Sequence, residues 1–209
     1  TSDFTRIGAL TLDASDTYLH DAVIDSVNGF AYFGGEQNAP GYVVKVDLSN
    51  FTRVGRINFN TGENGVRTAA IDTANGYAYF GTNTSPGNII RIRLSDFTRQ
   101  GTVTLQSSQD IPHTTIIDPG GGFLVVGTYT TNGYVVKVPF SQFEKITSLS
   151  LNAGENTVYS AVIDTVNGFA YFGMSTTPLG IVVKVRLSDF TRVGAITLPS
   201  GENDLRSAV

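Results

Sequence analysis

The chain has 209 residues with a formal net charge of −4, 41% hydrophobic residues and only 15% charged residues. Such a chain can bury a sizeable core, and its acidic balance argues against a nucleic-acid binder, which usually carries a basic stripe. No stretch approaches the ~18 consecutive apolar residues of a membrane-spanning helix. The absence of cysteine excludes disulfides and thiolate metal sites.

One segment recurs along the whole chain. The pattern Ser-Asx-Phe-Thr-Arg at residues 2–6 returns at 49–53, 95–99 and 188–192, and in altered form at 141–145. The steps are 46 or 47 residues, and a repeated aspartate keeps this spacing at Asp25, Asp72, Asp118 and Asp164. The chain therefore holds about four and a half copies of one unit.

Each unit contains four short segments that favour β-strands. In the last full copy these segments are 160–164, 169–172, 181–187 and 191–198, and Asn167-Gly168 separates the first two. Asn-Gly favours a tight hairpin because both residues tolerate positive φ, and no window shows a helical period. Four antiparallel strands repeated at this length are typical of β-propeller blades. A β-sandwich or β-solenoid is the alternative, but a sandwich has no reason to repeat at a fixed period.

We therefore predict an all-β chain that forms a single β-propeller array over residues 1–209. In chain order we expect a partial blade at 1–12, full blades at about 20–59, 66–105, 113–151 and 157–198, and a partial blade at 204–209. The strand expected at Thr5–Leu12 lacks inner partners, and an open strand edge invites pairing with another chain. We expect self-association through this edge, pairing near Arg206–Val209, or a longer array.

The repeat resembles a known family. Gly76-Tyr-Ala-Tyr-Phe-Gly-Thr-Asn83, followed by a Val/Ile-rich segment, resembles the YVTN-type propeller repeats of microbial surface-layer and secreted proteins. Copies at 29–34 and 168–173 share the form, whereas 122–127 departs further and Gly81 stands where the family motif has Thr. The resemblance implies a propeller at or outside the cell surface, and it implies no single ligand.

One position varies while its neighbours repeat. Five residues before each repeated aspartate lies a large side chain that can form hydrogen bonds: His20, Arg67, His113 or Tyr159, with Arg206 in the equivalent place. The innermost strand begins here, so these side chains are expected at the mouth of the central channel, where repeat proteins commonly carry function. We predict a ligand-binding role for these five residues. The alternative is that they are ordinary exposed loop residues.

Other recurrent side chains suggest structural roles. An acidic or amide position (Asp16, Glu63, Gln109, Glu155, Glu202) could bind Ca²⁺, but Gly-Glu-Asn is equally typical of a turn whose Glu points to water. We therefore predict no metal site and no cofactor. The repeated aspartate is expected to cap a turn, and the cation of the third strand (Lys45, Arg91, Lys137, Lys184) to reach the blade edge or a carboxylate. A repeated phenylalanine (Phe4, Phe51, Phe97, Phe143, Phe190) should be buried at one corner of each blade.

These features favour a non-enzymatic extracellular or cell-surface module for binding, adhesion or structure, with a glycan or protein ligand at the channel mouth. The alternative is a propeller enzyme of the lactonase-like class with its site over the channel. Catalytic motifs such as His-Glu-x-x-His and Gly-x-Ser-x-Gly do not occur in the chain. No nucleic-acid partner and no membrane span are predicted.

Overall fold

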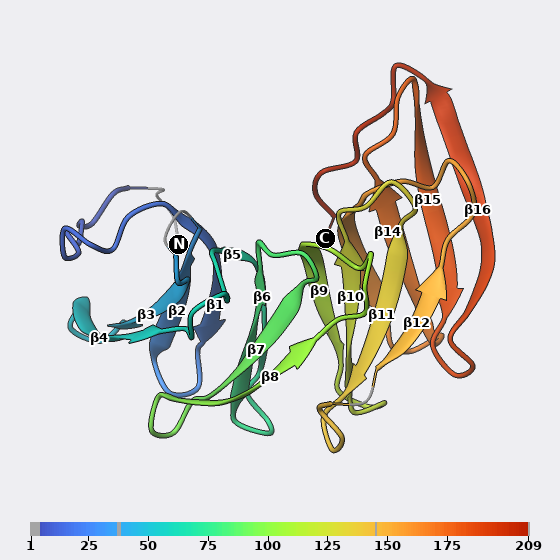
Figure 1. Cartoon of the computed structure of the whole chain (residues 1–209). Coiled ribbons are helices and arrows are strands. Elements are labelled where there is room, and N and C mark those ends of the chain that lie inside the picture. Colours follow the sequence, from blue (N-terminus) through green and yellow to red (C-terminus); the bar gives the residue numbers. More distant parts are fainter. Residues whose placement is uncertain (1–4, 37–38, 145, 209) are drawn as a thin grey trace.

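A computed structural model describes residues 5–36, 39–144 and 146–208. The regular structure of these residues consists of sixteen β-strands in four antiparallel sheets of four strands each (Figure 1). Every sheet is built from four strands consecutive in the sequence, so each repeat forms one blade. The prediction of an all-β chain with propeller-type blades is confirmed.

The strands of each blade follow one another from the inside to the outside. Blade 1 contains β1 (Leu19–Asp25), β2 (Phe30–Gly35), β3 (Tyr42–Asp47) and β4 (Thr52–Asn58). Blade 2 contains β5 (Val66–Asp72), β6 (Tyr77–Thr82), β7 (Asn88–Arg93) and β8 (Thr98–Thr104). Blade 3 contains β9 (Pro112–Asp118), β10 (Phe123–Thr128), β11 (Tyr134–Pro139) and β12 (Thr147–Ser150). Blade 4 contains β13 (Val158–Asp164), β14 (Phe169–Met174), β15 (Leu179–Arg186) and β16 (Thr191–Ser200).

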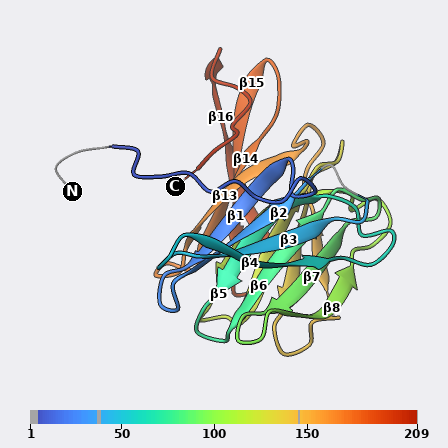
Figure 2. The same cartoon turned by 90° about the vertical axis from the view of Figure 1, so that its left-hand side faces the viewer.

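The four innermost strands lie side by side. Strand β1 contacts β5, β5 contacts β9, and β9 contacts β13, so these strands form the inner wall of the array. Figure 2 shows the array from the side of blade 1, with β1 to β4 toward the viewer. The same end of every innermost strand therefore faces the same rim of the molecule.

The turn between the first two strands of each blade is capped by the repeated aspartate. Asp25 accepts hydrogen bonds from the Asn28 backbone N–H at 3.0 Å and from the Asn28 side-chain amide at 2.7 Å. Equivalent bonds join Asp72 to Asn75 and Asp164 to Asn167, and the third turn uses the Gly121 N–H. The predicted capping role of these aspartates is confirmed.

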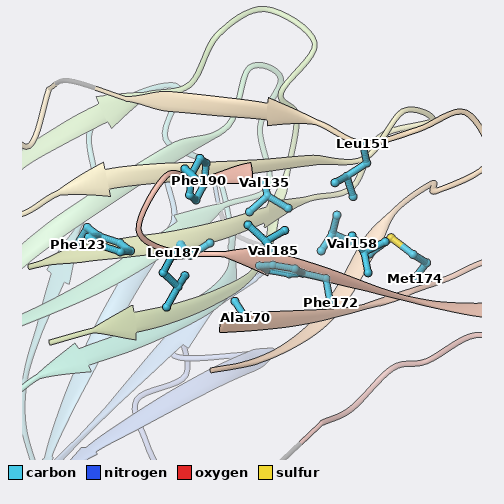
Figure 3. Close-up of a cluster of buried hydrophobic side chains, with 12 residues drawn as sticks. Phe123, Val135, Leu151, Val158, Ala170, Phe172, Met174, Val185, Leu187 and Phe190 are labelled. Carbon is cyan, nitrogen blue, oxygen red and sulfur yellow. The ribbon is translucent and has the colours of Figure 1, made fainter. Parts of the chain in front are cut away.

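Apolar side chains fill the seams between neighbouring blades. Figure 3 shows the seam between blades 3 and 4, where Phe123 and Val135 face residues of blade 4 such as Phe172. The approach is close: a Cβ added to Gly127 would lie 2.3 Å from Val158 Cγ1 of the next blade. The glycine at this repeat position is therefore required by the packing of the following blade.

The repeated phenylalanine is buried only where a preceding blade covers it. Phe143 and Phe190 are buried, and Phe97 is partly buried against Tyr32 of blade 1. Phe51 belongs to blade 1 and is 48% exposed. The predicted burial is thus correct for blades 3 and 4 and wrong for Phe51, while Phe4 lies outside the described residues.

The acidic or amide position does not point to water in four of its five copies. Asp16, Glu63, Gln109 and Glu155 are buried, and only Glu202 is exposed. Glu155 accepts the Asn152 N–H within its own turn and forms an ion pair with Arg192 on β16. Glu63 pairs in the same way with Arg99 on β8. Each carboxylate therefore fastens the linker between two blades to the outer strand of the second blade.

The cation of the third strand lies over an aromatic ring of its own blade. The Nζ atoms of Lys45, Lys137 and Lys184 lie 3.7 to 3.8 Å from the ring centroids of Phe30, Phe123 and Phe169. Burial lowers the pKa of Lys45, and the nearby Asp25 opposes this effect. We expected these cations to reach the blade edge or a carboxylate; the structure places the three lysines over ring faces, with Asp25 near Lys45.

The expected partial blades do not form as strands. Residues 5–12 and 204–208 contain no strand, so the predictions of an N-terminal outer strand and of a final inner strand are wrong for the described residues. Each segment nevertheless lies where the missing strand would pack. Leu10 and Leu12 pack on Tyr42 and Val44 of blade 1. At the other end, Leu205 donates its N–H to the Met174 carbonyl. These segments therefore contact the blades but add no strand to a sheet.

Candidate functional site at the channel mouth

The variable position marks a β-bulge at the start of each innermost strand. The register between the first two strands shifts around His20, Arg67, His113 and Tyr159, so each of these residues is left without a cross-strand partner. A bulge bends the strand locally and changes the direction of the extra side chain. The fifth residue, Arg206, lies in the segment after β16.

His20 and Arg67 meet around one carboxylate. Arg67 Nη1 lies 2.9 Å from Glu36 Oε1 and 3.4 Å from His20 Nε2. His20 Nε2 lies 3.9 Å from the other oxygen of Glu36. Glu36 follows β2, so blades 1 and 2 share this polar cluster.

Three aromatic rings continue the same rim across blades 3 and 4. The His113 and Tyr159 ring centroids are 4.0 Å apart, and the Tyr129 centroid lies 5.6 Å from that of His113. The Arg206 guanidinium lies 5.1 Å from the Tyr159 ring centroid and pairs with Asp204 at 2.6 Å. Such cation–aromatic contacts hold a flexible arginine near the ring.

A small pocket joins the two clusters. It has a volume of about 210 Å³ and is lined by Arg67, Ile111, His113, Tyr129 and Tyr159. The structure therefore brings all five predicted residues onto one continuous rim, with Arg67 contacting the first cluster and lining the pocket beside the second.

The pocket is polar, and its surroundings favour the neutral form of His113. Burial lowers the pKa of His113, and the positive charge of Arg67 lowers it further. His113 Nδ1 and Arg67 Nε are buried without a hydrogen-bond partner among the described residues.

A second variable position on the rim escaped the sequence analysis. It follows the second strand of each blade and holds Glu36, Asn83, Tyr129 and Ser175. The N–H at this position bonds to the linker in every blade, for example from Glu36 to the Tyr18 carbonyl at 2.9 Å. The sequence did contain a signal for this position. Its side chain changes in every copy, while the glycine two residues earlier never changes.

No group of three or more His, Asp or Glu side chains in the described part of the chain is arranged to hold a metal ion. Within the same residues, no helix has the length and apolar character needed to cross a membrane.

Comparisons with known proteins define the fold. No protein-family model matches the chain, and no curated protein matches it significantly. The β-propeller domain of Cps50 (Swd1) from Myceliophteria thermophila superimposes with a TM-score of 0.68 and 10% identity, covering 91% of this chain and 58% of that one. The WD40 repeats of RRP9 give a TM-score of 0.68 and 10% identity, with 84% and 50% covered. The chain is thus a β-propeller array that spans about half the length of these structures.

Proposed function

We propose that this chain is a non-enzymatic binding module that takes its ligand at the channel mouth. The observation that carries the proposal is the convergence of His20, Arg67, His113, Tyr159 and Arg206 on one continuous rim. Arg and Tyr are enriched among the residues that dominate binding energy at interfaces. A scaffold alone gives no reason for these residue types to gather at one end.

The remaining repeat positions have structural roles, which distinguishes them from the rim positions. The turn aspartate, the seam glycine and the linker carboxylate recur because each makes a structural contact in its blade. The two rim positions hold side chains that differ between neighbouring blades, and no side-chain contact recurs at them in every blade. Side chains that change from blade to blade gather on this rim, which favours recognition there.

We also propose a location outside the cell or at its surface. This part of the proposal rests on the resemblance of residues 76–83 to YVTN-type repeats of secreted and surface-layer proteins. Antibody labelling of intact and permeabilised source cells tests it. Labelling that requires permeabilisation contradicts an extracellular location.

The lactonase-like alternative has no comparable support, because the rim of the described residues offers no carboxylate or histidine cluster arranged for metal-assisted hydrolysis.

Binding to arrays of peptides and glycans tests the proposed function. Arg67→Gln should weaken the strongest interactions of the wild-type chain about tenfold, the change that 1.4 kcal/mol represents. Arg93→Gln is the matched control. Arg93 lies opposite Tyr77 in the register of β6 and β7, and therefore at the other end of blade 2 from Arg67. No binding to any array member, or equal losses in both variants, would overturn the proposal.

A further inference from the structure

A second, larger pocket lies beside the channel mouth over blades 3 and 4. Its volume is about 700 Å³, within the usual range for small-molecule sites. Tyr129 lines this pocket and also the small pocket of the rim. The linkers before β9 and β13 contribute Asp110 and Asn156, and the loop after β10 contributes Asn132.

Blade 3 departs from the repeat where it lines this pocket. Ser108 has a φ of 69°, a conformation that two other blades give to Gly62 and Gly154. Such a φ is unfavourable for a residue other than glycine, so the serine is placed here at a cost in stability.

Two further departures line the same pocket. Asp110 stands where two other linkers have Asn64 and Asn156, and Asn132 stands where two other blades have Pro40 and Pro86. Several departures at one pocket, one of them strained, indicate a specific site rather than scaffold.

The lining combines hydroxyls, amides, one carboxylate and an aromatic face. Tyr129 is 48% exposed and leaves part of its ring open to a ligand. The Asp110 carboxylate is held by a hydrogen bond of 2.7 Å from the Ser85 hydroxyl, which fixes its direction. No lysine or arginine lines this pocket among the described residues.

This chemistry matches a neutral sugar. Vicinal hydroxyls both donate and accept, so they can pair with a carboxylate and with amide groups in one plane, while the C–H face of the ring packs on an aromatic side chain. The lack of a lining cation disfavours an anionic ligand. The lack of aliphatic side chains disfavours a peptide, which usually needs an apolar anchor.

We propose that this pocket binds a neutral saccharide of one or two rings, with Tyr129 as the stacking platform and Asp110 as the principal hydrogen-bond acceptor. The proposal deepens the proposed function and rests on it, because it assigns the ligand class of the same rim.

Calorimetric titration with methyl mannoside, N-acetylglucosamine, lactose and cellobiose tests the proposal. At least one probe should bind the wild-type chain. Asp110→Asn should weaken that binding about tenfold, because hydrogen bonds to charged groups are the stronger ones. This variant installs the residue of the other linkers, so the fold should be retained.

The aromatic role is tested separately. Tyr129→Ala should abolish binding, and Tyr129→Phe should restore most of it, because stacking needs the ring and not the hydroxyl. Tyr18→Ala is the control, since Tyr18 is an exposed tyrosine of blade 1 outside the pocket.

Four results would overturn the saccharide proposal. These are no binding of any probe, binding unchanged in Asp110→Asn and Tyr129→Ala, equal loss in Tyr18→Ala, or tighter binding of an anionic heparin fragment. Peptide binding that depends on Arg67 without any sugar binding would overturn this proposal and leave the proposed function standing. If the chain binds neither peptides nor sugars, the saccharide proposal and the proposed function are both overturned.

Discussion

The seams between blades and the two end faces of the array contain the same repeat positions in different surroundings. Leu94 of blade 2 is 6% exposed against blade 1, whereas Leu48, its equivalent in blade 1, is 38% exposed. At the other end, Val103 of blade 2 is 3% exposed and the equivalent Ile196 of blade 4 is 61% exposed. Burial at a repeat position is therefore decided by the neighbouring blade.

The largest contrast is expected at the repeated phenylalanine. Phe190→Ala should lower the free energy of unfolding by about 3–5 kcal/mol, because it leaves a cavity in the seam between blades 3 and 4. Phe51→Ala should cost under about 1 kcal/mol, because its ring is already half in water. Both residues have φ near 50°, so backbone strain is matched. Urea unfolding of the two variants measures the difference, and equal losses would contradict the role of the seam.

The seam glycine should show a smaller contrast. Gly127→Ala should cost about 1–3 kcal/mol, because the new methyl group meets Val158 in β13 and neither strand can move freely. In Gly173→Ala the new methyl group meets the Ser160 hydroxyl and Leu205; the hydroxyl can rotate, and Leu205 lies outside any strand. Thermal unfolding should therefore show a smaller loss for Gly173→Ala. A larger loss there would mean that residues 204–208 are held as firmly as a blade.

Next in size is the linker ion pair. Arg192→Gln should cost about 1–3 kcal/mol, because the Glu155 carboxylate stays buried without its charged partner. The double variant Arg192→Gln/Glu155→Gln should recover part of this loss, since blade 3 already uses Gln109 bonded to Ser148 at this position. Chemical denaturation of the wild-type chain, of Arg192→Gln, of Glu155→Gln and of the double variant gives the coupling. Additive losses would show that the pair does not couple across the linker.

The smallest expected effect concerns pH at the rim. The folded-state pKa of His113 lies below its usual value of about 6.5, so protons bind the unfolded chain more readily. The contribution of His113 to stability is therefore complete above pH ~6.5 and is lost as the pH falls through the lowered pKa.

NMR titration of the His113 ring measures this pKa directly. Arg67→Gln should raise it toward the usual value by removing a positive charge, and Arg93→Gln should leave it unchanged. A His113 pKa at or above the usual value in the wild-type chain would contradict the burial of this ring.

Local sequence was sufficient for the blade and its turns. The 46- or 47-residue repeat and the Asn-Gly hairpins predict four strands per unit, because turn chemistry and β-propensity act over a few neighbouring residues. The same holds for Asp25, whose capping bonds reach only three residues ahead. The position of Arg67 and His113 on the rim was predicted from where the innermost strand begins in each repeat.

Only the tertiary structure decided which repeated residues are buried and which have partners. Glu155 and Arg192 are 37 positions apart, so their pairing depends on how a linker crosses the next blade. Residues 5–12 have the sequence of a strand but form none, because backbone hydrogen bonds need a neighbouring strand that sequence propensity cannot supply. The pocket beside Tyr129 depends likewise on four loops that meet only after the blades have packed.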